Sequence, residues 1–338
     1  MTGNPFLFRA RGFATPAFVA TLIGALLVVC FAVGGPGIVR QLVSGLMLGS
    51  IYMMVAVAFT LTIGVLNFLN FTIPTLFMLT GMVAWGLISK GYINFADGWS
   101  WLVGLACGIA VAVLASLLVE RFTFRYLKVK HGDAIEHAIP LVSSLGFLLI
   151  FEHLVLISLG SESHRFFVPF KADLHIGSLV VGVPQLASSL LAIVTVTTLS
   201  FVLKKTNTGR ALRTIAESAD TALLLGVETK KLVPIIFILT GVMAGLAGAL
   251  FTVNYQDVSP FMGDNVGTKA IAAMVLGGLG SIWGSIIGGL IVGVIETLSI
   301  YFFGGDSVQM VVWGALLAII ILRPQGLLGT AVSAKSRL

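Results

Sequence analysis

Charged and titratable side chains are rare in the apolar stretches of this 338-residue chain, so those that occur there are the first candidates for chemistry. They are Glu120, Glu136, His137, Glu152, His153, Lys269 and Glu296. Carboxyl and imidazole groups on one helical face could pass protons along a relay, but no single face gathers these residues. Glu296 lies deepest in an apolar stretch, and we therefore expect it to be paired or protonated.

Catalytic motifs are absent from the sequence. It contains no phosphate-binding GxxxxGK[S/T], no HExxH, no CxxC and no GxSxG. Cys30 and Cys107 both lie in apolar stretches, where a thiol is expected to act as a small packing residue rather than in a disulfide or metal site. The sequence therefore predicts a protein that is not an enzyme, has no metal or cofactor of its own and cannot hydrolyse ATP alone.

The elements that would position these residues are apolar helices. Hydrophobic residues make up 57% of the chain and charged residues 10%, against about a quarter charged in soluble domains. Strands of alternating polarity, as in a membrane barrel, do not occur. The sequence predicts an all-α polytopic membrane protein with about ten transmembrane helices. We place them near 14–35, 41–66, 74–89, 100–119, 138–159, 185–203, 232–253, 267–282, 284–303 and 308–322.

The basic residues predict the orientation of these spans. With both termini in the cytoplasm, 15 of the 20 Lys and Arg residues fall on the inner side. Orientation and anionic headgroups also account for the net charge of +6, without a nucleic-acid partner. The first span follows Arg9 and Arg11 and is interpreted as an uncleaved signal anchor rather than a signal peptide.

The hydrophilic segment 204–231 differs from the other connections because it can form two short capped helices. Thr208 is placed to cap the first helix, in which Ala211, Leu212 and Ile215 form one apolar stripe. The wetter side of this helix would carry Arg210, Arg213 and Glu217.

The second helix of this segment could begin at Ser218 or Asp220, and Gly226 is placed to end it in a left-handed conformation. A plain membrane connection needs only polar residues, whereas amphipathic helices need a surface to press against. We therefore interpret segment 204–231 as a docking surface for a partner protein, with the apolar stripe facing that partner.

Glycine patterns predict both helix packing and one break. Small-xxx-small pairs allow close helix approach in lipid; they are Gly45 and Gly49, Gly241 and Gly245, Gly280 and Gly284, and Gly289 and Gly293. The density of glycine between residues 277 and 284 predicts an interrupted helix, because each glycine weakens a helix by up to ~1 kcal/mol. Interrupted helices can line a solute path, which makes Gly277, Gly278 and Gly280 candidate pathway residues.

A second predicted break lies between spans two and three. Asn67, Asn70 and Thr72 precede Pro74, which suits the first turn of a helix. Two interpretations remain open: the polar residues form a simple capped turn, or they face the pathway of a solute.

Several motifs occur along the chain in an order and spacing typical of one transporter family. They are Leu48-Gly49-Ser50-Ile51-Tyr52, Val119-Glu120-Arg121-Phe122 with Arg125, Leu141-Val142-Ser143-Ser144-Leu145-Gly146, Gly209-Arg210-Ala211 with Ala216-Glu217, Leu224-Leu225-Gly226-Val227, Leu276-Gly277-Gly278-Leu279-Gly280-Ser281, Gly288-Gly289 and Arg323-Pro324-Gln325-Gly326. From about 41 to 330 the chain resembles the LivH-type permeases of ABC importers for branched-chain amino acids, whose fold is shared with ribose and vitamin B12 permeases.

The resemblance implies one permease domain over residues 1–338, with 1–40 as an added N-terminal span, in the bacterial inner membrane. Implied partners are a second, LivM-like permease or a second copy of the chain, two ABC ATPase subunits that hold ATP and Mg, an extracytoplasmic substrate-binding protein and membrane lipid. Segment 204–231 would be the cytoplasmic coupling segment that contacts the ATPase subunits. The residues expected to couple are Gly209, Arg210, Leu212, Ile215, Glu217, Leu224 and Gly226.

The expected function is ATP-driven uptake of an amino-acid-like or other small organic solute. The alternative is an ion- or proton-coupled secondary transporter, which would need charges at a coupling site inside the membrane. A facilitative channel would need only the pore. The family usually has Asn-Phe-Ala-His-Gly after span two, whereas here Thr72-Ile73-Pro74 follows Asn70-Phe71. This stiffer, more apolar turn predicts a less polar or bulkier solute than a simple aliphatic amino acid.

Overall fold

The computed structural model describes residues 37–92, 99–123, 138–169, 173–176, 179–217, 222, 224–323 and 325–328. The helices are α2 (Gly37–Leu66), α3 (Ile73–Ser89), α4 (Ser100–Glu120), α6 (Ala138–Leu159), α7 (Val183–Lys205), α8 (Asn207–Glu217), α10 (Thr229–Tyr255), α11 (Met262–Gly277), α12 (Ile282–Phe303) and α13 (Val308–Leu322), with a 3-10 turn at Gly305–Ser307. The short strands are β1 (His164–Arg165), β2 (Asp173–Ile176), β3 (Leu179–Gly182) and β4 (Asp257–Val258).

Six of the described helices are long and apolar enough to cross a membrane, namely α2, α4, α6, α7, α10 and α12. They correspond to six of the predicted spans, and α3 and α13 are shorter apolar helices where two further spans were expected. The all-α polytopic class is therefore confirmed for the part of the chain that the structure describes. The predicted span 267–282 is wrong in its bounds, because α11 ends at Gly277. The predicted span 14–35 lies outside the described residues.

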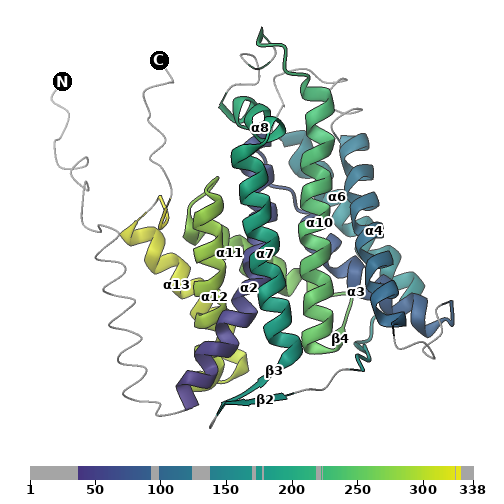
Figure 1. Cartoon of the computed structure of the whole chain (residues 1–338), viewed down its shortest axis with the longest axis vertical. Helices are drawn as coiled ribbons and strands as arrows, with labels where there is room; N and C mark the ends of the chain where they lie inside the picture. Colours follow the sequence, from purple (N-terminus) through teal and green to yellow (C-terminus); the bar gives the residue numbers. More distant parts are fainter. Residues whose placement is uncertain are drawn as a thin grey trace.

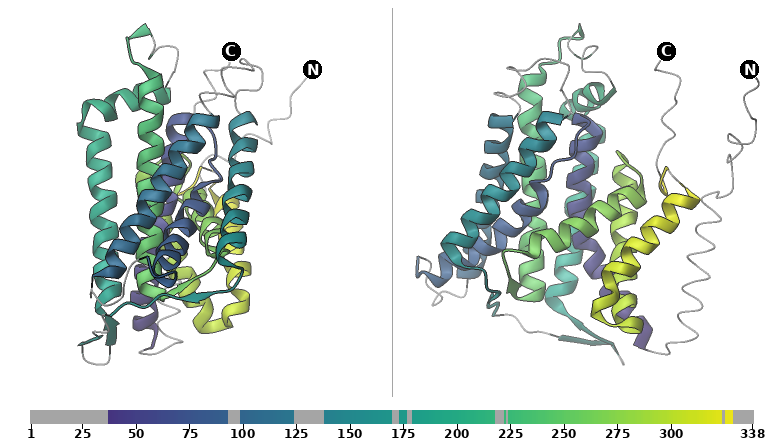
Figure 2. Two further views of the ribbon diagram at one scale, coloured as in Figure 1. Left: turned by 90° about the vertical axis from the view of Figure 1, so that its right-hand side faces the viewer. Right: turned by 180° about the vertical axis from the view of Figure 1, so that it is seen from behind.

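The bundle has two distinct ends. Helix α8 lies at one end, and the antiparallel hairpin β2–β3 lies at the opposite end (Figure 1). At the hairpin end β1 pairs with β4, so that the connection after α6 is tied to the connection after α10. The views in Figure 2 show the long helices running between these ends.

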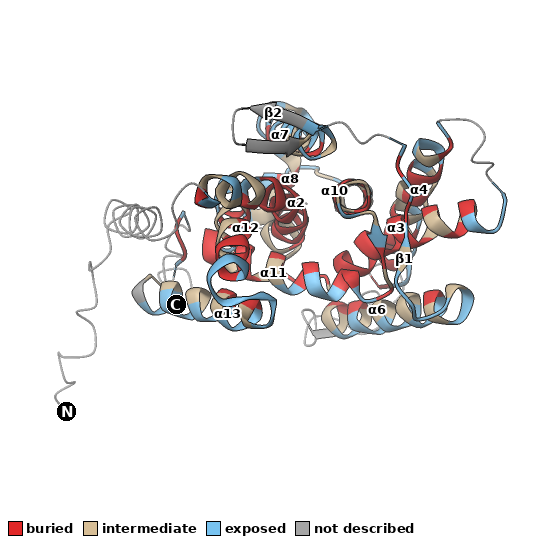
Figure 3. Cartoon of the chain, turned by 90° about the horizontal axis from the view of Figure 1, so that it is seen from below, coloured by how far each residue is buried: buried red, intermediate tan, exposed pale blue. Residues whose placement is uncertain are grey.

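Helix α2 forms the centre of the protein. Its residues from Met47 to Thr62 are buried without interruption, which is expected of a helix that is apolar on all sides. It contacts α12, α10, α11 and α7. Seen from below, buried residues gather on α2, α3, α11 and α12, whereas α6 and α13 carry many exposed residues (Figure 3). The core is thus built around α2, and the outer helices α6 and α13 have apolar faces that are exposed on the outside of the bundle.

Glycines set the contact between α2 and α12. A Cβ atom on Gly49 would lie 2.7 Å from Cα of Leu290, and one on Gly293 would overlap the backbone of Gly49. A Cβ on Gly45 would lie 2.8 Å from Cα of Val294. The two small-xxx-small pairs predicted from the sequence therefore face one another across a single helix contact, which brings the two backbones together.

We expect Gly293→Ala to lower the stability of the folded protein by about 1–3 kcal/mol, because the new methyl group has no space and the helices must separate. Gly314→Ala in α13 is the matched control, since a Cβ there meets nothing within 4 Å. Thermal unfolding of the two purified variants in the same detergent measures the difference. An equal midpoint for Gly293→Ala and the wild type would contradict the assigned contact.

Candidate functional site

The turn between α2 and α3 is held by its own hydrogen bonds. Asn67 is exposed and has a left-handed φ of 56°, and its N–H donates to the carbonyl of Ile63 at the end of α2. Asn70 and Thr72 are fully buried, and Asn70 Oδ1 accepts from the Thr72 N–H at 3.1 Å and from Thr72 Oγ1 at 2.7 Å. The structure therefore brings Asn70 and Thr72 together but separates Asn67 from them. The three residues therefore do not form one shared surface, and the N-terminus of α3 has no side-chain cap, so their role in a solute pathway stays a prediction.

The apolar residues of this turn pack α3 against α11. Ile73 is fully buried, and Pro74 lies so close to Gly263 and Gly267 that a Cβ on either glycine would overlap it. On the other side, the Phe71 N–H donates to Ser144 Oγ of α6 at 3.2 Å. The residues that depart from the family pattern are thus packed inside the protein.

We expect Asn70→Ala to destabilise the protein by about 1–2 kcal/mol, because Thr72 loses the acceptor for both its N–H and its hydroxyl. Asn67→Gly is the control and is expected to leave stability unchanged within about 0.5 kcal/mol, since glycine adopts a left-handed conformation readily. Thermal unfolding of both variants tests this. A larger loss for Asn67→Gly than for Asn70→Ala would reverse the assignment.

The predicted helix break between α11 and α12 is confirmed. Gly278 and Gly280 have φ angles of 112° and 80°, and Ser281 Oγ accepts from the Gly284 N–H at 3.1 Å to cap α12. Gly277 lies against the backbone of Gly284, where a side chain on either residue would overlap the other. The break is therefore a tight, glycine-dependent turn.

The last described residues complete this turn. The N–H groups of Leu327 and Leu328 donate to the carbonyls of Leu276 and Gly277, each at 2.9 Å. Those carbonyls end α11 and have no partner within the helix. These two carbonyl groups at the break are thus satisfied by the protein itself.

Helix α8 differs from its sequence prediction in two respects. Its cap is Thr206 rather than Thr208, because Thr206 Oγ1 accepts from the Gly209 N–H at 3.1 Å. Leu212 and Ile215 are 2% and 7% exposed and lie in the protein's own interior. The expectation that this stripe faces a partner is therefore wrong: an amphipathic pattern shows that a face is covered, and here α2 and α7 cover it.

Four of the other predicted coupling residues, Arg210, Glu217, Leu224 and Gly226, are exposed, whereas Gly209 is buried. Leu224 is 89% exposed although it is apolar. Gly226 adopts a φ of 79°, which confirms the predicted left-handed end. Gly209 lies so close to the carbonyl of Leu203 that a Cβ would overlap it, which allows α8 to fold back on α7. Ser218 and Asp220 lie outside the described residues.

A cavity of about 310 Å³ joins α8 to the helix break. Its lining includes Leu212 and Arg213 of α8, Thr60 of α2, and Gly280 and Trp283 at the break. Lys204 Nζ lies 5.0 Å from the centroid of the Trp283 ring, within the range of a cation–π contact. Two regions that the sequence analysis treated separately are therefore neighbours.

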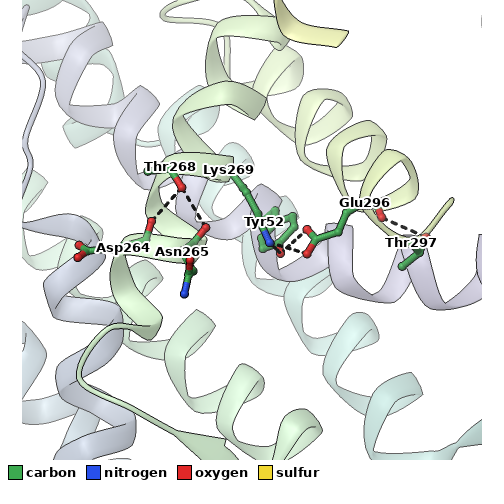
Figure 4. A network of polar contacts seen from close by, with 8 residues as sticks. Tyr52, Asp264, Asn265, Thr268, Lys269, Glu296 and Thr297 are labelled. Atoms are coloured by element: carbon green, nitrogen blue, oxygen red, sulfur yellow. Dashed lines mark hydrogen bonds and ion pairs between the residues drawn. The ribbon is translucent and has the colours of Figure 1, made fainter. Parts of the chain in front are cut away.

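A polar cluster lies inside the bundle, formed by Tyr52 of α2, Lys269 of α11 and Glu296 of α12 (Figure 4). The Tyr52 hydroxyl donates to Glu296 Oε2 at 2.6 Å, and Lys269 Nζ lies 2.5 Å from Glu296 Oε1 and 3.4 Å from the Tyr52 hydroxyl. The side chains of Lys269 and Glu296 are 16% and 9% exposed. The expectation that Glu296 is paired is confirmed.

Sequence reasoning missed the pairing itself. Lys269 and Glu296 were recognised as rare charges near the membrane, but their partnership depends on how α11 and α12 pack. Two opposite charges on consecutive apolar helices were the only signal available. The cluster borders a second cavity, of about 450 Å³. Among the described residues, no group of three or more His, Cys, Asp or Glu side chains could hold a metal ion.

Membrane-length apolar helices packed through glycines, with one helix interrupted at a tight turn, define a multi-pass α-helical membrane protein. The chain belongs to the family described as the branched-chain amino acid transport system / permease component, which matches residues 41–321. The LivH-type resemblance seen in the motifs is thereby confirmed.

Named relatives are similar over most of their length. The chain is 28% identical over 298 residues to the high-affinity branched-chain amino acid transport system permease protein LivH of Salmonella typhimurium, covering 86% of this chain and 95% of that protein. It is 28% identical over 297 residues, with the same coverage, to the corresponding permease protein BraD of Pseudomonas aeruginosa. The D-allose transport system permease protein AlsC of Escherichia coli is 30% identical over 188 residues, 53% of this chain and 56% of that protein. These relatives are transport permeases rather than enzymes.

Proposed function

We propose that the chain is the permease subunit of an ATP-driven ABC importer in the bacterial inner membrane, which moves an amino-acid-like or other small organic solute into the cytoplasm. Its partners would be two ABC ATPase subunits carrying ATP and Mg, an extracytoplasmic binding protein, and a second permease that is LivM-like or identical. The observation that carries the proposal is the position of α8, anchored on the core and sharing a cavity with the helix break.

The buried face of α8 supports a role in transmitting movement. Leu212 and Ile215 fix the helix to the bundle, so a push on its exposed side is passed to the core rather than absorbed by a loose loop. The shared cavity leaves room for such a shift next to Gly280 and Trp283. ATP-driven closure of the ATPase subunits would then move α8 against α2 and change the packing at the break.

The exposed side of segment 204–231 supports docking. Arg210 and Glu217 provide charges, and Leu224 and Leu225 are apolar side chains that are 89% and 69% exposed. Adjacent apolar residues that are exposed are typical of a protein-binding surface. Docking is therefore assigned to this side of the segment.

A secondary transporter is the second candidate, and the buried Lys269–Glu296 pair is the observation in its favour. Charges of this kind mark ion or proton pathways in many transporters. The pair is closed, however, and the described part of the chain offers no third carboxyl or imidazole group hydrogen-bonded to it. Membership of the permease family and the anchored α8 favour the ATP-driven importer.

We expect Leu224→Asp to reduce co-purification of the ATPase subunits about tenfold, because a charge replaces an apolar contact at the docking surface. The stability of the chain alone should not change, since this side chain is almost fully exposed. Tyr92→Asp, in an exposed position after α3, is the control and should bind normally. Leu212→Asp should instead lower the thermal stability of the chain itself, as it buries a charge. Normal complex formation and uptake by Leu224→Asp would exclude this surface.

In liposomes that contain the complete complex, we expect uptake to require ATP and the binding protein and to continue in the presence of a protonophore. The physical reason is that the energy enters through α8 rather than through an ion gradient. Accumulation of a labelled amino acid with and without ATP measures this. Transport by the chain alone, driven by a proton or sodium gradient, would favour the secondary transporter.

A further inference from the structure

The cavity beside the Tyr52–Lys269–Glu296 cluster has a polar floor and an apolar wall. The apolar lining residues that are buried are Met47, Leu48, Met262 and Val266, none more than 8% exposed. At the rim, Tyr255 and Asn265 are exposed, so the cavity can be reached from outside the protein. A site of about 450 Å³ with these walls suits a small molecule that is polar at one end and apolar at the other.

The charges around the cavity restrict what that polar end can be. Lys269 is cationic, Glu296 and Asp257 are anionic, and these are the charged side chains among the described lining residues. The lining therefore carries a net negative charge, which disfavours a ligand with only a carboxylate. A simple anion would also draw Lys269 away and leave the buried Glu296 without its partner, which is costly.

A ligand with both charges avoids this cost. Its carboxylate can take the place of Glu296 beside Lys269, while its ammonium group takes the place of Lys269 beside Glu296, so that every buried charge stays paired. The Tyr52 hydroxyl, already bonded to Glu296, fixes the carboxylate of Glu296 for this role. Ser188 Oγ donates to Asn254 Oδ1 at 3.1 Å and orients a further amide at the cavity wall.

We propose that this cavity is a binding site within the permease for a zwitterionic solute, with Lys269 binding its carboxylate, Glu296 binding its ammonium group and the Met47–Leu48–Met262 wall holding an apolar side chain. In the absence of solute, Lys269 and Glu296 neutralise each other. Solute therefore exchanges with an existing ion pair instead of entering an empty charged site. The inference rests on the proposed transport function, because the bound molecule is the one that is carried.

Binding to the purified full-length chain, without ATPase or binding protein, tests the site independently of ATP-driven uptake. The probes are L-leucine and L-phenylalanine, each compared with the analogues that lack one charge: 4-methylpentanoate and 3-methylbutylamine, and 3-phenylpropanoate and 2-phenylethylamine. We expect at least one amino acid to bind about tenfold or more tightly than both of its analogues, since each lost pairing of a charged hydrogen bond costs that much. Binding of neither amino acid, or equal binding of an analogue, would overturn the proposal.

Glu296→Gln separates a binding role from a purely structural ion pair. It should weaken amino-acid binding about tenfold or more and strengthen binding of the carboxylate analogue, because Lys269 is released. If the Lys269–Glu296 ion pair only stabilises the fold, Glu296→Gln should not strengthen the binding of any ligand. Glu162→Gln, at an exposed position, is the matched control and should bind as the wild type does. A folded Glu296→Gln protein that binds every probe as before, or that loses all binding without the gain, would contradict the assignment.

Tyr52→Phe provides a second variant if Glu296→Gln does not fold. It keeps the buried ring and removes only the hydroxyl that donates to Glu296. We expect amino-acid binding to weaken several-fold, with the carboxylate analogue unaffected, and unchanged amino-acid binding would count against the site. If the variants bind as expected but uptake does not need ATP, the binding site is supported and the importer proposal is wrong. If uptake needs ATP but the variants do not bind as expected, the importer proposal is supported and the binding site is wrong.

Discussion

The contact between α2 and α12 depends on the absence of side chains. In a lipid environment apolar helices gain little from the hydrophobic effect, and their association depends on close van der Waals approach. Gly45 and Gly49 on α2 face Gly289 and Gly293 on α12, and the residue numbers rise along one helix as they fall along the other, so the helices are antiparallel. Because α2 is also the helix that most others surround, the rest of the bundle is arranged around this one contact.

The same contact places the polar groups of both cavities. Tyr52 lies on α2 near Gly49, and Glu296 lies on α12 near Gly293. Because the glycines bring the two backbones together, the long Tyr52 side chain reaches across the contact and its hydroxyl lies 2.6 Å from the Glu296 carboxylate. Towards the α8 end, Thr60 and Ser285 hydrogen-bond across the same pair of helices. One helix contact thus lies between the cavity at the polar cluster and the cavity at α8. A change in the packing of α2 against α12 would be felt at both.

The features predictable from the sequence are those set by local physics. Apolar length predicted the long spans, glycine density predicted the break at Gly278 and Gly280, and the position of Gly226 predicted its left-handed conformation. The features that the sequence analysis missed depend on how the helices pack against one another. An apolar stripe on α8 indicates that something covers it, but not whether that is α2 or another protein. Two neighbouring threonines can each cap a helix, and only the fold-back on α7 selects Thr206. The partnership of Lys269 with Glu296 follows from the helix packing alone.

The segment from Gly326 to Leu328 gives the protein an order of assembly. The carbonyls of Leu276 and Gly277 at the end of α11 receive their hydrogen bonds from Leu327 and Leu328, which are made after the whole of α12 and α13. Because Leu327 and Leu328 follow α12 and α13 in the chain, these two hydrogen bonds cannot form before both helices have been made. The turn between α11 and α12 is closed only when the residues after α13 return to it. A chain that ended before these residues would leave the carbonyl groups of Leu276 and Gly277 without these hydrogen bonds inside the bundle, where an unpaired backbone group is costly.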